Sequence, residues 1–566
     1  MKTIIILSAL IISYGTYAKS SKDDNKLDSI IEDGWKFSLK QSPQRAHFFS
    51  KNAPADILND VSERHHNETA AGYQGLLNKL SKIKRNKLSS ENKINYDMYQ
   101  DILAGLVADI EFKEYQFPIT SEGSFHVDLA SMSDHLSFNK AQDYDNYLKK
   151  MTQIPRVFDQ HISNMRNGLK TGMTQPQIII QHYPEFIEKY ITSNSQDSSF
   201  YKPFKVVNKN ISQEKSASLK QQAQQIISQK VMPAYENFKK FMQEEYIPAA
   251  KIDIGAYSFP NGKAYYQQQI KEYTTLDLSP EEIHEIGLKE VSRIRVQMEQ
   301  IIKQTGFEGT FAEFLQFLRT DEQFYATSAE QLLKEASFIA KKMDGKLPLL
   351  FTKLPRQPYT VNPVPEQIAA NYTTGRYVSA PIGSTRPGQY WVNTYALEKR
   401  PLYNLEALTF HEAVPGHHLQ GALNAELDNL PNFRRYNYIS AFGEGWGLYC
   451  EKLAKEVGFY KDPYSDFGRL TYEMWRAVRL VVDTGMHAFG MTRDEAIKLM
   501  EENTALSKHN VRTEIDRYIG WPAQALSYKL GELKIWELRS KAENELGINF
   551  DIRTFHDAIL SKGSVP

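Results

Sequence analysis

The chain has 566 residues, and 68 Lys and Arg residues balance 68 Asp and Glu residues to a formal net charge of zero at pH 7. This balance argues against nucleic acid or an anionic membrane as the main partner. The length fits one large domain or two to three ordinary ones, and a hydrophobic content of 41% is ample for a core. The only cysteine, Cys450, excludes an intrachain disulfide.

Residues 1–18 have the pattern of a cleaved secretory signal peptide. Lys2 is basic, residues 3–13 are largely apolar, and Ala18 is a small residue directly before Lys19. The apolar run is too short for a comfortable membrane span, and no cysteine lies near the expected cleavage site, so we expect no stable membrane or lipid anchor. An exported protein without disulfides fits the bacterial periplasm or secretion. The alternative is a buried N-terminal helix.

Residues 19–345 are predicted to form an N-terminal helical region. Apolar positions recur at three- and four-residue spacing, mixed with Lys, Glu and Gln, over residues 60–106, 144–169, 213–246 and 279–305. The last of these segments opens on Ser-Pro-Glu-Glu, which is a helix-capping pattern. His284 and Glu285 follow inside it without a second histidine in reach, so we interpret this pair as structural.

Residues 346–566 are predicted to form a second region, which begins with a small sheet. Prolines surround two short alternating runs, residues 376–380 and 389–393, which are typical of strands. An edge strand can hold an extended peptide by main-chain hydrogen bonds. Tyr377 is therefore a candidate substrate-binding residue.

The motif His-Glu-Ala-Val-Pro-Gly-His-His at residues 411–418 carries the strongest chemical signal, together with Glu444 downstream. Catalytic zinc sites use histidine nitrogens and a carboxylate oxygen and keep one position open for water. The metal lowers the pKa of that water, and a neighbouring carboxylate such as Glu412 can take its proton. The motif therefore predicts a Zn²⁺ site with His411 as one ligand.

The spacing within this motif does not fit an unbroken helix. Two zinc histidines on one helix stand four residues apart, but that position holds Pro415, and the next histidines are His417 and His418. Pro415 and Gly416 favour a kink or bulge that returns His417 to His411. We expect His417 to be the second ligand, with His418 as the alternate, and the other histidine to contact substrate or support the site.

The segments HEAVPGHHLQ and GEGWGLYCE, residues 411–420 and 443–451, resemble the bacterial domain of unknown function 885 family, which is grouped with gluzincin-type metallopeptidases. The similarity covers most of the mature chain, and it implies a zinc-dependent hydrolase of peptides without a known substrate. Glu444-Gly445-Trp446 also resembles the Asn-Glu-Gly-Phe segment of aminopeptidase gluzincins, which implies that Glu444 is the third zinc ligand. The lengthened histidine motif is similar to that of dipeptidyl peptidase III, which has one extra residue where this chain has two.

Resemblance to helical zinc peptidases such as thimet oligopeptidase and angiotensin-converting enzyme implies a His and a Tyr that stabilise the oxyanion. The candidates are His487 and Tyr518, with Tyr528 third; each can instead be a packing residue. Arg476 and Arg479 stand three apart on one helical face and could clamp a substrate carboxylate, or pair internally with Glu473 or Asp483. Glu451 has either a supporting role or an ordinary solvated position.

We therefore expect a mainly α, bowl-like metallopeptidase with a small β-sheet next to the zinc helix. His411, His417 and Glu444 would hold zinc, and Glu412 would activate water. Short or unfolded peptides are the expected substrates, no oligomeric state is predicted, and a C-terminal carboxylate contact would make the enzyme a carboxypeptidase or dipeptidase. Three alternatives remain: a zinc hydrolase of a non-peptide amide or ester, a secreted non-catalytic binding protein, and a structural zinc site.

Overall fold

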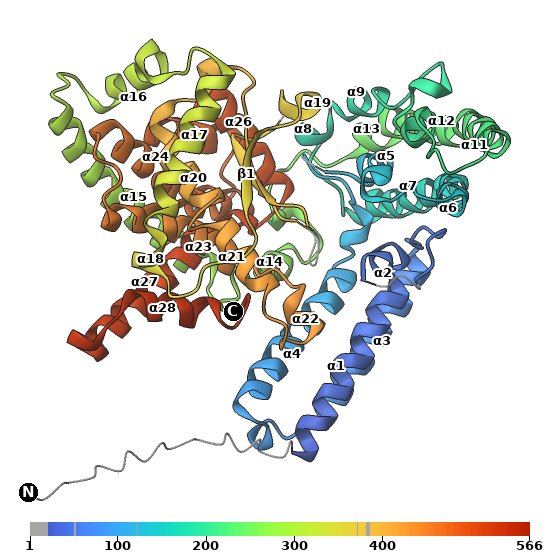
Figure 1. Cartoon of the computed structure of the whole chain (residues 1–566), viewed down its shortest axis with the longest axis horizontal. Coiled ribbons are helices and arrows are strands. Elements are labelled where there is room, and N and C mark those ends of the chain that lie inside the picture. The colour runs from blue at the N-terminus through green and yellow to red at the C-terminus, as the bar shows by residue number, and fades with distance from the viewer. Residues whose placement is uncertain (1–20, 50–52, 122, 371, 381–384) are drawn as a thin grey trace, which may run out of the picture.

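The fold is mainly α with one small sheet, as the sequence predicts. The computed structural model describes residues 21–49, 53–121, 123–370, 372–380 and 385–566. The signal peptide expected over residues 1–18 lies outside the described residues. Figure 1 shows a helical arm and a second helical lobe on one side of a larger body that contains the sheet and the C-terminal helices.

The arm is built from three long helices, and its short helix α2 (Pro43–Phe49) lies beside them. Serine residues cap the long helices: the hydroxyls of Ser21, Ser62 and Ser89 accept backbone N–H groups in the first turn of each. Leu27 and Leu103 are among the residues of its own apolar core. The long helices are α1 (Lys22–Gln41), α3 (Glu63–Leu80) and α4 (Ser90–Glu111).

The second lobe packs around its own hydrophobic core. Tyr235 and Phe238 are fully buried there, and π-helical turns at residues 227–231 and 242–246 keep the predicted segment 213–246 nearly continuous. Its helices are α5 (Phe125–Ala130), α6 (Ala141–Thr152), α7 (Ile154–Thr171), α8 (Gln177–Ile180), α9 (Tyr183–Glu188), α10 (Lys202–Lys205), α11 (Gln213–Ile226), α12 (Met232–Phe241) and α13 (Ile247–Ala249).

Two helix pairs form the centre of the large body. α15 (Pro280–Thr305), which starts at the predicted capping box on Ser279, packs along α24 (Pro463–Ala488), a helix that is buried from Asp466 to His487. α23 (Ser440–Leu453) crosses α27 (Ser527–Leu546) where Gly445 meets Gly531; a Cβ on Gly445 would lie 2.5 Å from the Gly531 carbonyl carbon. The two glycines let the helices approach until their backbones touch.

The remaining helices of the body surround these pairs. The body core draws on residues before and after position 345, so the composition change there does not separate two cores; the predicted domain division stays a prediction. The helices are α14 (Gly262–Thr274), α16 (Phe311–Thr320), α17 (Ala329–Asp344), α18 (Leu347–Leu350), α19 (Glu366–Ala369), α20 (Leu405–Glu412), α21 (His417–Ala425), α22 (Asn432–Arg435), α25 (Arg493–Asn503), α26 (Lys508–Gly520) and α28 (Ile552–Leu560).

The sheet has three strands in the order β1-β3-β2. The two expected strands appear as β2 (Gly375–Val378) and β3 (Gly388–Val392), which pair antiparallel with Tyr377 opposite Tyr390. A third strand, β1 (Tyr359–Pro363), runs parallel to β3 and is not predicted by the sequence pattern. β2 is therefore an edge strand, with one side of its backbone turned away from the sheet.

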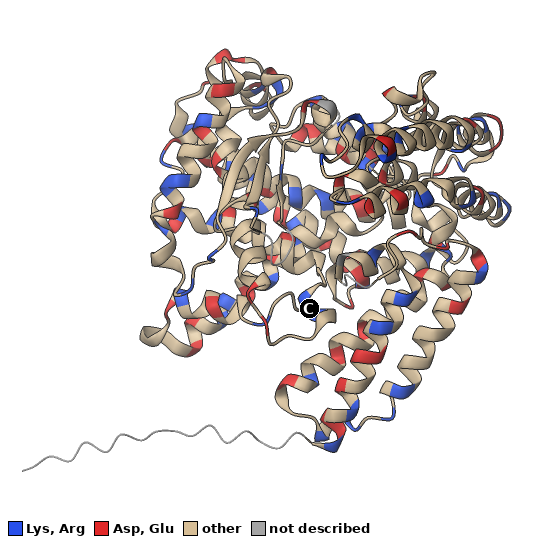
Figure 2. Cartoon of the chain, turned by 45° about the vertical axis from the view of Figure 1, so that its right-hand side comes forward, with Lys and Arg blue, Asp and Glu red and all other residues tan. Residues whose placement is uncertain are grey.

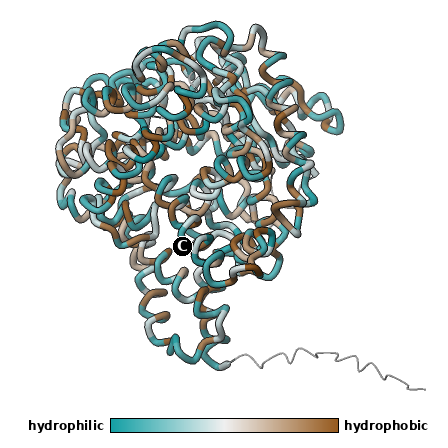
Figure 3. The backbone as a smooth tube through the Cα atoms, turned by 90° about the vertical axis from the view of Figure 1, so that its left-hand side faces the viewer, coloured by the Kyte–Doolittle hydropathy of each residue, from teal (hydrophilic) through white to brown (hydrophobic). Residues whose placement is uncertain are grey.

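Charges of both signs are interspersed over the molecule in the view of Figure 2, consistent with the zero net charge. Hydrophilic and hydrophobic stretches alternate along most helices in Figure 3, which is the pattern of amphipathic helices around a core. Within the described part of the chain, no helix combines the length and the apolar character that a membrane crossing requires.

Candidate metal centre

The histidine motif lies at a break between two helices. α20 ends at Glu412 and α21 begins at His417, so the predicted kink is a complete interruption at residues 413–416. Gly416 packs against the end of α20, where a Cβ would lie 1.9 Å from the His411 carbonyl oxygen. The Trp446 indole N–H donates to the Pro415 carbonyl oxygen at 2.9 Å and holds the loop against α23.

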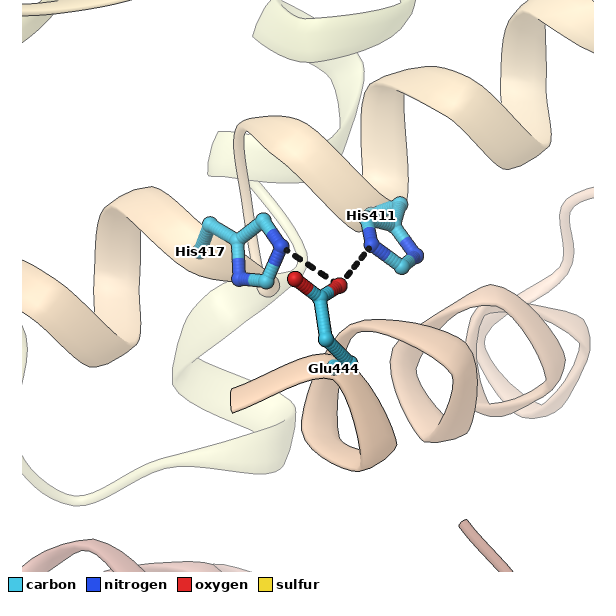
Figure 4. A group of neighbouring side chains, drawn as sticks. All are labelled: His411, His417 and Glu444. Carbon is cyan, nitrogen blue, oxygen red and sulfur yellow. Dashed lines mark hydrogen bonds and ion pairs between the residues drawn. The ribbon is translucent and has the colours of Figure 1, made fainter. Parts of the chain in front are cut away.

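This break brings His411 and His417 to the same point, opposite Glu444 on α23 (Figure 4). The Nε2 atoms of His411 and His417 lie 3.3 Å and 3.4 Å from Glu444 Oε2. One ligand atom from each residue lies within 4.8 Å of the other two, a spacing that could hold a metal ion. The two imidazole rings are perpendicular, with centroids 4.7 Å apart.

A buried carboxylate orients the first histidine. Glu451, two turns after Glu444 on α23, accepts a hydrogen bond from His411 Nδ1 at 2.8 Å, which leaves Nε2 facing Glu444. Burial opposes charge on His411, but Glu444 and Glu451 outweigh it and raise the pKa of His411 to about 9. Metal binding would displace this proton, because a histidine ligand must be neutral. Glu451 thus takes the supporting role rather than the solvated one.

Replacement of Glu451 by glutamine is expected to weaken zinc binding without abolishing it. A carboxylate behind a histidine ligand fixes the ring and raises its basicity, and its loss costs about 10- to 100-fold in metal affinity. Competition with a chromophoric chelator measures the change. The matched control is Glu456→Gln, because Glu456 pairs with Arg539 at the far end of the same helical segment. Equal zinc affinity in the two variants would contradict the supporting role of Glu451.

His418, the alternate ligand, points away from the cluster. Its Nδ1 lies 3.1 Å from the Tyr377 hydroxyl, and its ring packs against Tyr359 with centroids 4.6 Å apart. Burial lowers the pKa of His418 to about 4, so the ring is neutral. His418 therefore links α21 to the sheet, and the structure gathers His417 rather than His418 with His411.

Glu412 lies beside the cluster on the wall of a cavity of about 630 Å³. Its Oε2 accepts the backbone N–H of Tyr377 on edge strand β2 at 2.7 Å. The cavity is lined by His411, Glu412, His417 and Glu444 and by the β2 residues Gly375, Arg376 and Tyr377. The Glu412 carboxylate, the candidate metal ligands and the edge strand β2 thus face one cavity.

Neither His487 nor Tyr518, the two expected oxyanion donors, is among the residues that line this cavity. His487 uses both ring nitrogens on backbone groups: Nδ1 accepts from Ala256 N–H at 3.1 Å, and Nε2 lies 3.0 Å from the Tyr518 carbonyl oxygen. The Tyr518 hydroxyl accepts from Arg479 and Trp475 and donates to Glu514. Both side chains are buried, and their polar atoms are hydrogen-bonded within the protein.

Tyr528, the third candidate, does line the cavity. Its ring lies nearly parallel to His411, with centroids 6.4 Å apart. Burial first, and then the charge of Glu444, raises the pKa of Tyr528, so its hydroxyl stays protonated and able to donate.

Arg476 and Arg479 also line the cavity, and neither forms the expected internal pair with Glu473 or Asp483. Arg476 Nη2 lies 3.4 Å from Glu451 Oε1, and Arg479 Nη2 donates to Glu514 Oε2 at 3.0 Å. Glu473 instead contacts the buried Lys529, which also binds Glu290 and Glu532 and joins α15, α24 and α27.

Several residues that line the cavity lie outside the histidine motif at residues 411–418. Tyr438 donates to Glu444 Oε1 at 3.1 Å and completes the support of that carboxylate. Tyr438 stands six residues before Glu444, so its closeness in the sequence to an expected ligand is the one signal that points to it. Glu272, Tyr273 and Trp521 come from elements distant in sequence, and only the tertiary fold places them on the wall.

Mainly helical architecture, a His-His-Glu cluster and an adjacent glutamate define the chain as a candidate metalloprotein. Residues 43–566 match the family described as "Bacterial protein of unknown function (DUF885)", and the chain belongs to that family. The chain is similar to a crystal structure of a predicted lipoprotein from Colwellia psychrerythraea, at 29% identity and a TM-score of 0.90, over 96% of this chain and 97% of that chain. No curated protein matches the chain.

A second solved structure, a predicted lipoprotein of unknown function from Shewanella oneidensis, shares the fold. Its identity to this chain is 18% and the TM-score is 0.72, over 97% of this chain and 98% of that chain. At this identity the likeness shows the architecture alone.

Proposed function

We propose that the protein is a zinc-dependent hydrolase that cleaves short or unfolded peptides. The observation that carries this proposal is the convergence of His411, His417 and Glu444, with Glu412 on the wall of the same cavity. Two histidine nitrogens and one carboxylate oxygen form a common donor set of catalytic zinc sites. A structural zinc site would use four protein ligands, often cysteines, and the single Cys450 is buried.

The donor set fits zinc in chemistry as well as in number. His411 is oriented by Glu451, and Glu444 is held by Tyr438, so each has a partner that fixes the ligand atom. Zinc, when bound, supplies a Lewis acid that polarises a carbonyl and acidifies water near neutral pH.

The remaining chemistry falls to residues of the chain. Glu412 takes a proton from the attacking water and passes it to the leaving nitrogen. One water is consumed, the amide C–N bond breaks, and a carboxylate and an amine form. The backbone N–H of Tyr377 holds Glu412 in place, and edge strand β2 binds an extended substrate as an added strand. Tyr528, in place of His487 and Tyr518, donates to the oxyanion.

We further propose that the protein works outside the cytoplasm, in the periplasm or after secretion. A similar protein with the same fold, at 29% identity, is described as a predicted lipoprotein, and lipoproteins are exported proteins. The signal pattern of residues 1–18 agrees with export.

The proposed activity is tested by incubating the purified protein with a mixed peptide library, with and without a chelator. We expect cleavage that the chelator stops and that added zinc restores. Cleavage that resists the chelator would contradict a metal mechanism. Zinc binding without cleavage of any peptide would contradict the peptidase proposal and favour a non-peptide amide or ester, or a binding role.

A further inference from the structure

Two buried guanidinium groups lie in the wall of the metal cavity. Arg476 and Arg479 stand three residues apart on α24, so they share one face of that helix. They are only 5% and 2% exposed, yet both line the space that His411 and Glu412 line. Burial of two like charges near one another is costly unless anions accompany them.

Aromatic rings hold both guanidinium groups in fixed positions. The Trp475 ring lies 4.5 Å from the guanidinium carbon of Arg476 and 4.3 Å from that of Arg479. The Tyr528 ring lies 5.8 Å and 4.2 Å from the same two atoms. A stacked guanidinium is preorganised, so a ligand that binds it loses little side-chain entropy.

Among the described residues, neither arginine has a carboxylate to itself. Glu451, 3.4 Å from Arg476, already accepts the His411 hydrogen bond at 2.8 Å. Glu514, 3.0 Å from Arg479, is shared with Arg517 and with the Tyr518 hydroxyl. Within the described part of the chain, Arg476 Nε and Arg479 Nη1 are buried without a hydrogen-bond partner. The pair therefore has unused capacity for an anion.

We propose that Arg476 and Arg479 bind the C-terminal carboxylate of a short peptide, so that the enzyme removes residues from the C-terminus. This inference rests on the proposed peptidase function and names its substrate class. Glu451 contacts both His411 and Arg476, so the pair lies near the metal ligands, and an extended residue spans about 3.5 Å. The planar guanidinium fork matches a carboxylate, and 630 Å³ is in the size range of pockets for small ligands.

The first test compares two ligands that differ only at the C-terminus. N-acetyl-trialanine as the free acid and as the amide is titrated calorimetrically into the zinc-supplemented Glu412→Gln protein, which should bind without turnover. We expect the acid to bind about 10- to 150-fold more tightly, the range for a hydrogen bond to a charged group. Equal binding of acid and amide, or no binding of the acid, would overturn the proposal.

The second test removes one guanidinium. Arg476→Gln should lose most of the preference for binding the acid. In the active enzyme, which retains Glu412, the same change should raise KM more than it lowers kcat. Arg476→Lys should restore part of it. The control is Arg469→Gln, on the same helix and equally buried, but paired with Asp466 and Glu473 away from the cavity lining. A preference that survives Arg476→Gln would overturn the assignment.

The two proposals can fail separately. Acid-selective binding that depends on Arg476, without cleavage of any peptide, would support the carboxylate site and contradict the peptidase function. Cleavage of free acids and amides at equal rates would support the peptidase function and contradict the carboxylate site.

Discussion

Glu412→Gln is expected to keep its zinc and lose about 10²- to 10⁴-fold in kcat, the usual contribution of a general base. Glutamine has nearly the same shape and retains an oxygen that can accept the Tyr377 N–H, so the wall of the cavity should not move. The glutamine amide cannot take a proton from water at neutral pH. The prediction is checked by measuring how fast the variant hydrolyses a peptide that the wild-type protein cleaves, together with its zinc content and its far-UV circular dichroism.

The chain offers a matched control for this variant. Glu406 also lies on α20, and its Oε2 accepts a backbone N–H, that of Tyr460, at 3.1 Å. Glu406 is not among the residues that line the metal cavity. Glu406→Gln should therefore retain activity. Full turnover in Glu412→Gln would show that another group accepts the proton.

His417→Ala and His418→Ala are expected to have opposite effects on zinc, although the two histidines are adjacent. His417 Nε2 faces Glu444, whereas His418 faces Tyr377 and Tyr359. His417→Ala removes one of three ligands, so we expect loss of stoichiometric zinc and of activity. His418→Ala should keep zinc and lose some stability, since it leaves a gap between α21 and the sheet.

Elemental analysis and thermal unfolding with and without added zinc measure both effects. A ligand that binds only the folded state raises the melting temperature, so added zinc should stabilise the His418→Ala protein and not the His417→Ala protein. The reverse result would make His418 the ligand and would require a different arrangement of α21.

The cluster of His411, His417 and Glu444 is predictable from the sequence because its members lie in two short segments. Pro415 and Gly416 interrupt the helix, and this local effect decides where His417 can turn. The helical fold and strands β2 and β3 follow in the same way from periodicity and turn residues. Strand β1 is not predictable in this way, because it pairs parallel to β3 and that pairing depends on contacts between segments that are separated in the sequence.

The positions of the oxyanion candidates are not predictable from the sequence. α24 is buried on all sides, so its apolar pattern does not reveal which face His487 or Arg476 occupies. Tyr518 and Tyr528 are both aromatic residues near the C-terminus, and only packing separates them: Tyr518 is enclosed by Trp475, Arg479 and Glu514, whereas Tyr528 faces the cavity. Packing between segments that are distant in the sequence decides these positions, and the neighbouring residues do not predict that packing.

The central claim is that His411, His417 and Glu444 hold one zinc ion, and elemental analysis of the purified protein beside its Glu444→Ala variant tests it most directly. The account predicts about one zinc per chain in the wild type and little in the variant, since a catalytic zinc site needs its three protein ligands. A wild-type protein that takes up no zinc, or a Glu444→Ala protein that keeps a full complement, would contradict it.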